Sequence, residues 1–140
     1  MTPDEVKWDF IQAWLEKADT DLRAARLLVP HGARFYDICG FHAQQAVEKF
    51  LKAFLIYHDI EPPPTHHIRR ILSVVSAVDG TLAGSVREAD DLTPYAVQAR
   101  YPGGSPEPDE PEAGRLLKLA SIVEGEVLGR LSPYLSSGRP

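Results

Sequence analysis

The sequence lacks the features that mark a secreted or membrane-spanning chain. It holds a single cysteine, Cys39, so no disulfide can form within the chain. It has no run of about 20 apolar residues, which is the length that crosses a bilayer. The first residues, Met1 to Glu5, have neither the basic start nor the apolar run of a secretion signal. We therefore expect a cytoplasmic protein with no membrane association.

Several motifs with known chemistry are also missing. No Gly-x-x-x-x-Gly-Lys loop and no strand followed by Gly-x-Gly-x-x-Gly is present, so neither common phosphate-binding loop is available. The five histidines do not occur in His-Glu-x-x-His or Glu-x-x-His spacing, so we expect no metal site and no cofactor. Cys39 lies beside Ile38 and Gly40, a setting that suits a small buried residue better than a nucleophile.

The composition that is present is that of one globular domain, residues 1–140. Hydrophobic residues make up 44% and charged residues 25%, and 140 residues suffice to bury a core. The formal net charge is −5. Because non-specific affinity for nucleic acid comes mainly from neutralised phosphates, we expect no binding to double-stranded DNA and only local anion sites.

Apolar residues recur at helical spacing along most of the chain, and no segment alternates as a β-strand does. The spacing predicts helices over about residues 4–29, 34–58, 66–78, 82–99 and 112–134. Short connections are typical of antiparallel neighbours. The expected fold is therefore all-α, an up-and-down antiparallel bundle of four to five helices. Pro94 is expected to kink or split the fourth helix. The composition of residues 101–111 predicts a mobile loop, and residues 136–140 are expected to form a frayed tail.

The helix predicted over residues 34–58 is the centre of the bundle. Glu48 and Lys52 stand four residues apart in the order that stabilises a helix. Gly40 costs roughly 1 kcal/mol there relative to alanine, which suggests a close approach by a neighbouring helix; the alternative is simple tolerance.

A polar stripe runs beside the apolar face of this central helix. Four residues form it at spacings of three and four: His42, Gln45, Lys49 and Lys52. The simpler interpretation is the wetted side that a bundle helix needs. The alternative is a binding surface, in which His42 and Gln45 contact a base or ribose and Lys49 meets a phosphate. Arg100 and Tyr101, just past the fourth helix, would add a phosphate fork and a stacking ring.

The run Thr65-His66-His67 has two interpretations as well. Thr65 is well placed as the N-cap of the third helix, and this accounts for the run structurally. The functional interpretation is that the first-turn amides receive an anion, with His66, His67, Arg69 and Arg70 nearby.

In four segments the identity of the residues is more specific than helix periodicity requires. They are Trp14-Leu15-x-x-Ala18-x-x-Asp21-Leu22-x-x-Ala25, Phe41-His42-Ala43-Gln44-Gln45-Ala46-Val47-Glu48-Lys49-x-Leu51-Lys52-Ala53, Pro64-Thr65-His66 and Ala99-Arg100-Tyr101-Pro102. In these segments the chain resembles the HEPN domain family, whose order they follow over nearly the whole chain. The resemblance implies an up-and-down helical bundle, commonly a two-fold dimer, similar to the helical substrate-binding part of aminoglycoside nucleotidyltransferases.

The resemblance also implies a role. Such proteins are often encoded beside a minimal nucleotidyltransferase, and the pair is expected to act as a toxin and antitoxin or as a two-part nucleotide-transfer system. Many HEPN relatives are metal-independent ribonucleases in which a histidine follows an arginine after four to six residues. Here Arg34 and His42 have seven residues between them, and the pair Arg26 and His31, which has four, lies at a helix end beside Pro30. We therefore do not expect this ribonuclease activity.

The sequence thus favours a nucleotide- or RNA-binding module that forms a homodimer and works with a minimal nucleotidyltransferase. The residues predicted to bind are His42, Gln45, Lys49, Arg100 and Tyr101, with His66 a weaker addition. Two alternatives stay open. One is a divergent ribonuclease that uses His42 or His66 as acid or base, and the other is a purely structural interaction subunit.

Overall fold

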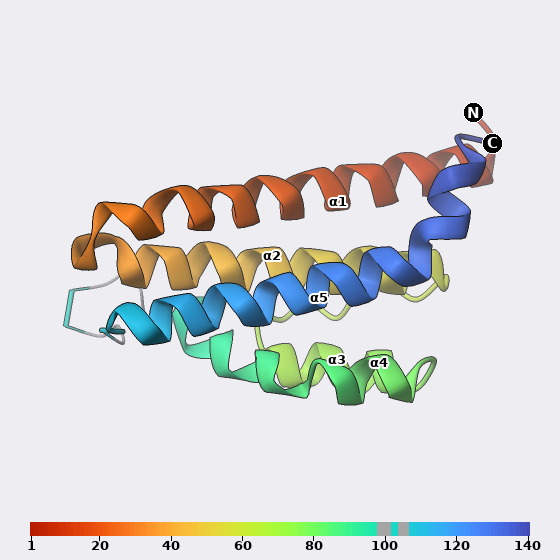
Figure 1. Cartoon of the computed structure of the whole chain (residues 1–140). Helices are drawn as coiled ribbons and strands as arrows, with labels where there is room; N and C mark the ends of the chain where they lie inside the picture. Colours follow the sequence, from red (N-terminus) through yellow and green to blue (C-terminus); the bar gives the residue numbers. More distant parts are fainter. Residues whose placement is uncertain (98–101, 104–106) are drawn as a thin grey trace.

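The computed structural model describes residues 1–97, 102–103 and 107–140, and within them the chain is helical and contains no strand (Figure 1). The elements are α1 (Pro3–Leu28), η1 (Val29–His31), η2 (Ala33–Phe35), α2 (Tyr36–Tyr57), α3 (Ile68–Ser76), α4 (Gly80–Ser85), η3 (Arg87–Tyr95) and α5 (Glu110–Ser137), where η denotes a 3₁₀-helix. The predicted all-α helical bundle is confirmed. Among the described residues, no helix combines the length and the apolar character that a membrane crossing requires.

α2 is the central helix and packs against α1, α5, η3 and α3. α1 and α2 are antiparallel, whereas α5 runs in the same direction as α2 (Figure 1). The reason is that the segment after α2 runs back along this helix and places His66 beside Gln44 and Glu48. After α3 and α4, η3 ends with Tyr95 against Gly40, near the start of α2. The start of α1 and the ends of α2 and α5 therefore meet, where Tyr134 lies 5.0 Å from both Trp8 and Tyr57, measured between ring centroids.

The sequence of α1 specifies both its start and its buried face. Thr2 and Glu5 form a capping box, in which Thr2 Oγ1 accepts from the Glu5 amide at 3.1 Å and Glu5 Oε1 accepts from the Thr2 amide at 2.9 Å. The buried side carries residues spaced by three and four: Ile11, Leu15, Ala18, Leu22 and Ala25. This stripe packs on α2 and fixes which side of α1 faces that helix.

The third helix begins two residues later than predicted. Thr65 is not its N-cap, because Thr65 Oγ1 accepts from the amide of His67, which lies before the helix, at 3.1 Å. The first amides of α3 are satisfied from η3 instead. Ile68 donates to Thr93 Oγ1 at 3.1 Å and Arg69 donates to Asp90 Oδ1 at 3.0 Å. The first-turn amides that the alternative interpretation assigned to an anion therefore already bond to Thr93 and Asp90.

The prediction of one helix over residues 82–99 is also wrong for its described part, residues 82–97. The chain forms the short helix α4 and then the 3₁₀-helix η3, which contains Pro94 near its end. The backbone leaves the α-helical region at Val86, where ψ is 16°. Residues 98–101 and 104–106 lie outside the described residues, and they include four of the eleven positions of the expected loop over 101–111. The last two positions, Glu110 and Pro111, belong to α5.

Gly40 allows the close approach that its position suggested. A Cβ atom built on Gly40 would lie 2.3 Å from Cδ1 of Tyr95, so the Tyr95 ring occupies the space of a side chain. Both residues are buried. The neighbour is therefore η3, and the contact holds the end of η3 against the start of α2.

The C-terminal residues lie against the start of α1 (Figure 1). α5 continues to Ser137, three residues past the expected end. Beyond it, Arg139 Nε donates to Asp9 Oδ1 at 3.0 Å and Arg139 Nη1 donates to Glu5 Oε2 at 2.7 Å. These ion pairs connect the predicted tail to α1.

Candidate functional site

A carboxylate from α1 brings two residues of the polar stripe together. Asp21 Oδ1 lies 2.9 Å from His42 Nδ1, and the ammonium of Lys49 donates to Asp21 Oδ2. The three side chains are partly buried, with exposed fractions of 14% for Asp21, 28% for His42 and 22% for Lys49. Because His42 and Lys49 are seven residues apart on α2, they lie on one side of the helix, two turns from each other, and Asp21 bridges them.

The charge of Asp21 follows from these contacts. Burial alone would raise the pKa of its carboxyl, but the hydrogen bonds from His42 and Lys49 and their charges outweigh burial and hold the pKa below its ordinary value. Asp21 is therefore ionised at neutral pH. It fixes the orientation of the His42 ring through Nδ1, and among the described residues nothing is bonded to Nε2.

A second carboxylate, Glu48 of α2, is the centre of a more deeply buried cluster. Glu48 Oε2 accepts from Lys52 Nζ at 2.8 Å, and Glu48 Oε1 lies 2.8 Å from His66 Nδ1. The Glu48 side chain is 5% exposed and that of Lys52 11%, whereas His66 is 56% exposed. Burial would raise the pKa of Glu48, but the hydrogen bonds from Lys52, His66 and Gln44 keep it below its ordinary value.

Two glutamines connect the stripe to the Glu48 cluster. Gln45 Nε2 donates to Gln44 Oε1 at 2.7 Å, and Gln44 Nε2 donates to Glu48 Oε1 at 3.2 Å and to the carbonyl oxygen of His66 at 3.0 Å. Gln44 is fully buried and Gln45 only partly. Gln44 thus holds the segment after α2 in place, and Gln45 keeps one amide hydrogen and its carbonyl oxygen without a partner among the described residues.

The comparison with protein families decides the assignment. The model of the HEPN domain matches residues 11–129, which include both carboxylate clusters. The chain belongs to the HEPN domain family. No curated protein and no solved structure matches it. Membership in this family places the chain among proteins with nucleotide- or RNA-related functions in general.

The HEPN structure brings together some of the predicted site residues. His42 and Lys49 share Asp21. His66 contacts Glu48 directly, and Gln45 reaches Glu48 through Gln44. Lys52 does not belong to a wetted stripe as predicted. It is buried, bonds to Glu48 and lies 5.7 Å from the centroid of the Trp14 ring. Arg100 and Tyr101 lie outside the described residues, so their place beside the stripe stays a prediction.

Three residues of these clusters were not predicted as site residues: Asp21, Gln44 and Glu48. A signal for them was present. Each belongs to a segment that resembles the HEPN family, and each is a polar residue directly beside an apolar stripe of its helix. Their contacts join residues 18 to 28 positions apart, and helix periodicity does not show which residues of two helices meet.

The described residues give little support for a metal site or for a cysteine nucleophile. Within residues 1–97, 102–103 and 107–140, no group of three or more histidine, cysteine or acidic side chains is placed to hold a metal ion. Cys39 is 1% exposed. Its burial, and secondarily the charge of Asp37, raises the pKa of the Cys39 thiol to about 11, so the thiol is protonated at neutral pH and a poor nucleophile.

Proposed function

We propose that this HEPN domain binds a nucleotide or a single-stranded RNA end at the cluster of Asp21, His42 and Lys49. The observation that carries the proposal is that one carboxylate holds an ammonium and an imidazole on the same side of α2, and both side chains are partly exposed. Lys49 has three N–H groups and directs one to Asp21. His42 Nε2 has no partner among the described residues, and because Nδ1 faces the carboxylate, Nε2 accepts from a ligand in the neutral ring and donates only when both ring nitrogens carry hydrogens. Phosphate oxygens accept charge-assisted hydrogen bonds from such donors.

The charges of the cluster also bear on binding. The carboxylate of Asp21 balances the ammonium of Lys49. A phosphate at this place therefore competes with Asp21 for the hydrogens of Lys49, and the binding relies on local hydrogen-bond donors.

We further propose that the domain acts in the cytoplasm as a homodimer with a minimal nucleotidyltransferase, in a toxin–antitoxin or nucleotide-transfer pair. The resemblance of the four sequence segments to the HEPN family supports this role. Light scattering on the purified chain tests the dimer. Co-purification with the product of an adjacent nucleotidyltransferase gene tests the pair, and the absence of such a gene and complex would remove this part of the proposal.

Titration of the purified protein with ATP and with short single-stranded RNA tests the binding site. The double variant Lys49→Ala, Arg100→Ala is expected to lose binding. A matched control is Lys118→Ala, which removes an exposed lysine from α5. Binding that is unchanged in the double variant would remove these residues from the site, and no binding of either ligand to the wild type would contradict the function.

A second function, ribonuclease activity, is favoured by one specific observation. His42 and His66 each have Nδ1 against a carboxylate, of Asp21 and Glu48 respectively. A carboxylate in this position orients an imidazole and leaves its other nitrogen for proton transfer. This hypothesis predicts metal-independent cleavage that leaves a cyclic phosphate and growth inhibition on expression. Cleavage no greater than that of a His42→Ala, His66→Ala variant would dismiss it.

The third candidate is an interaction subunit without a ligand. It is favoured by the way the polar side chains bond to one another, since no buried side-chain nitrogen or oxygen of the described residues lacks a partner. Titration with ATP and RNA separates it from the first function. It requires that the protein fold and assemble but bind neither ligand.

A further inference from the structure

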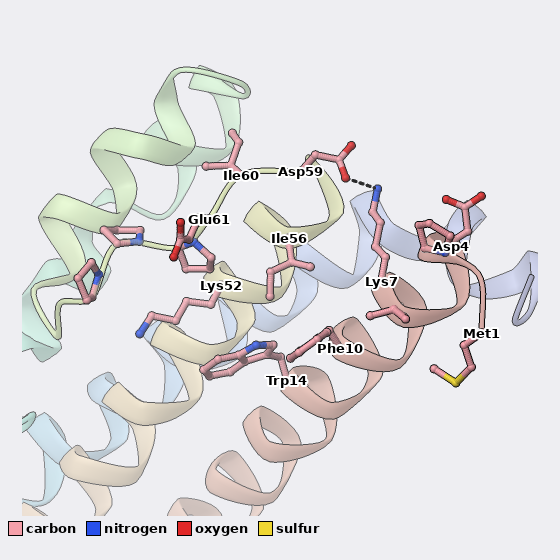
Figure 2. Close-up of a pocket in the computed structure, with 15 residues that line it drawn as sticks. Met1, Asp4, Lys7, Phe10, Trp14, Lys52, Ile56, Asp59, Ile60 and Glu61 are labelled. Carbon is pink, nitrogen blue, oxygen red and sulfur yellow. Dashed lines mark ion pairs between the residues drawn. The ribbon is translucent and has the colours of Figure 1, made fainter.

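An open groove lies between the first half of α1, the end of α2 and the segment 59–64. Its volume is about 910 Å³, within the range of small-molecule sites. Figure 2 shows Phe10 and Trp14 side by side on α1, with Ile56 of α2 and Ile60 of the connecting segment across the groove. Pro62, Pro63 and Pro64 complete the wall. Phe10 is 57% exposed although it is a large aromatic residue, which no packing within the chain explains.

The charges along this groove do not favour a phosphate. Two lysines line it, and each already has a carboxylate partner. Lys7 Nζ lies 3.1 Å from Asp59 Oδ1, and Lys52 Nζ donates to Glu48 at 2.8 Å. Lys52 also lies over the Trp14 ring and fixes that ring from the side of α2. The groove therefore suits an uncharged, flat, apolar group, whereas an anion finds no unpaired lysine there.

The groove ends at Trp14 and Lys52, and the cluster of Asp21, His42 and Lys49 lies further along the same two helices. Trp14 and Asp21 are seven residues apart, so they lie on one side of α1 with about 10 Å between them along the axis. On α2, Lys52 at the edge of the groove is three residues after Lys49, which is less than one helical turn. A single ligand can therefore reach both regions if it joins a flat apolar group to a phosphate.

From this juxtaposition we infer that the groove receives a nucleobase of the ligand, stacked against Phe10 and Trp14, while its phosphate meets Lys49 and His42. This inference rests on the proposed function, since it concerns how the same ligand is held. Aromatic side chains stack on every base, so the groove gives affinity with little sequence preference. Asp4 and Glu61 at the rim add acceptors for the amino groups of bases.

Fluorescence of Trp14 tests the stacking. The sequence contains two tryptophans, Trp8 and Trp14, so Trp8→Phe leaves Trp14 as the only reporter. ATP and short single-stranded RNA are titrated separately, which shows whether the base comes from a mononucleotide or from RNA. An abasic ribose-phosphate oligomer is the control ligand. We expect a saturable change in Trp14 emission with at least one base-containing ligand and none with the abasic oligomer.

A variant of the exposed aromatic provides the second measurement. Phe10→Ser is expected to weaken binding about five- to a hundred-fold, the range that loss of one stacking contact produces. Leu27→Ser is the matched control, because Leu27 is a 71% exposed apolar residue of the same helix outside the groove. Circular dichroism confirms that each variant is folded.

The outcomes separate this inference from the proposed function. If RNA or ATP binds but Phe10→Ser behaves like Leu27→Ser and Trp14 emission does not respond, the base subsite is overturned and the phosphate site stands. If neither ligand binds the wild type at all, both the proposed function and the base subsite are overturned. Equal binding of the abasic oligomer would likewise contradict stacking in the groove.

Discussion

Asp21 on α1 and His42 on α2 lie against each other, with Oδ1 and Nδ1 2.9 Å apart. The pair connects the first two helices through polar atoms, beside a core contact that is otherwise apolar. It also orients the imidazole of His42 and brings Lys49 to the same carboxylate. This arrangement contributes both to stability and to the proposed binding site, and substitutions distinguish the two.

Asp21 is expected to make the stability of the protein depend on pH. Its pKa lies below the ordinary value of 3.8 in the folded protein, because the bonds from His42 and Lys49 outweigh burial. Its contribution is therefore present in full above about pH 4 and is lost as the pH falls through the lower, folded-state pKa. Wild type is expected to exceed Asp21→Asn by about 1–3 kcal/mol in free energy of unfolding at pH 7, and this difference shrinks below pH 4.

Urea unfolding across this pH range checks the prediction. Asp19→Asn is the matched control, since the ion pair of Asp19 with Arg23 is an exposed pair within one helix, of the kind that contributes about 0.3–0.5 kcal/mol. An Asp21→Asn variant whose stability follows that of Asp19→Asn at every pH would show that the Asp21 contacts are not stabilising.

Among the polar residues, Glu48 is expected to be the one whose substitution lowers the free energy of unfolding most. Glu48→Gln leaves the buried ammonium of Lys52 without its carboxylate, a change that typically costs about 3–5 kcal/mol. Replacing both residues, as in Glu48→Gln, Lys52→Met, removes the unpaired charge and should recover much of that loss. Urea unfolding of the wild type, both single variants and the double variant measures the coupling between the two positions. Additive effects in this cycle would contradict a direct buried ion pair.

Gly40→Ala is expected to destabilise the protein even though alanine favours helices. The added Cβ would lie 2.3 Å from Cδ1 of Tyr95, inside a packed contact, and overpacking typically costs about 1–3 kcal/mol. Gly129 in α5 is the matched control, because a Cβ built there meets no other part of the described chain within 4 Å beyond its own helix turn. Gly129→Ala should stabilise by about 0.4–1 kcal/mol. Thermal unfolding of the two variants compares them, and shifts of the same sign would be inconsistent with the Tyr95 contact.

The long helices were predictable because the spacing of their apolar residues is visible in the sequence itself. The apolar spacing of Ile11, Leu15 and Leu22 identifies α1 without knowledge of its partner. The start of α3 was not predictable in the same way. Its first amides bond to Asp90 and Thr93, which are more than 20 residues further along the chain. A cap supplied by tertiary contact leaves no local signal, so Thr65 was the reasonable but incorrect choice.

The candidate site was predicted only from its α2 side. His42, Gln45 and Lys49 are visible as a polar stripe, but the carboxylate that holds two of them comes from another helix. Lys52 illustrates the same limit. Its spacing predicts exposure, yet Trp14 from α1 lies against it and Glu48 neutralises it. Which polar residues of a helix face water depends on neighbours that the periodicity of one helix does not show.

The salt dependence of RNA binding tests the central claim most directly. The affinity of a short single-stranded RNA is measured at several salt concentrations for the wild type, for Lys49→Ala and for the control Lys118→Ala. If Lys49 contacts a phosphate, its removal weakens binding and lowers the slope of log K against log salt by about 0.7, the value for one phosphate on a single strand. Lys118→Ala should match the wild type. Unchanged affinity and slope in Lys49→Ala would contradict the account.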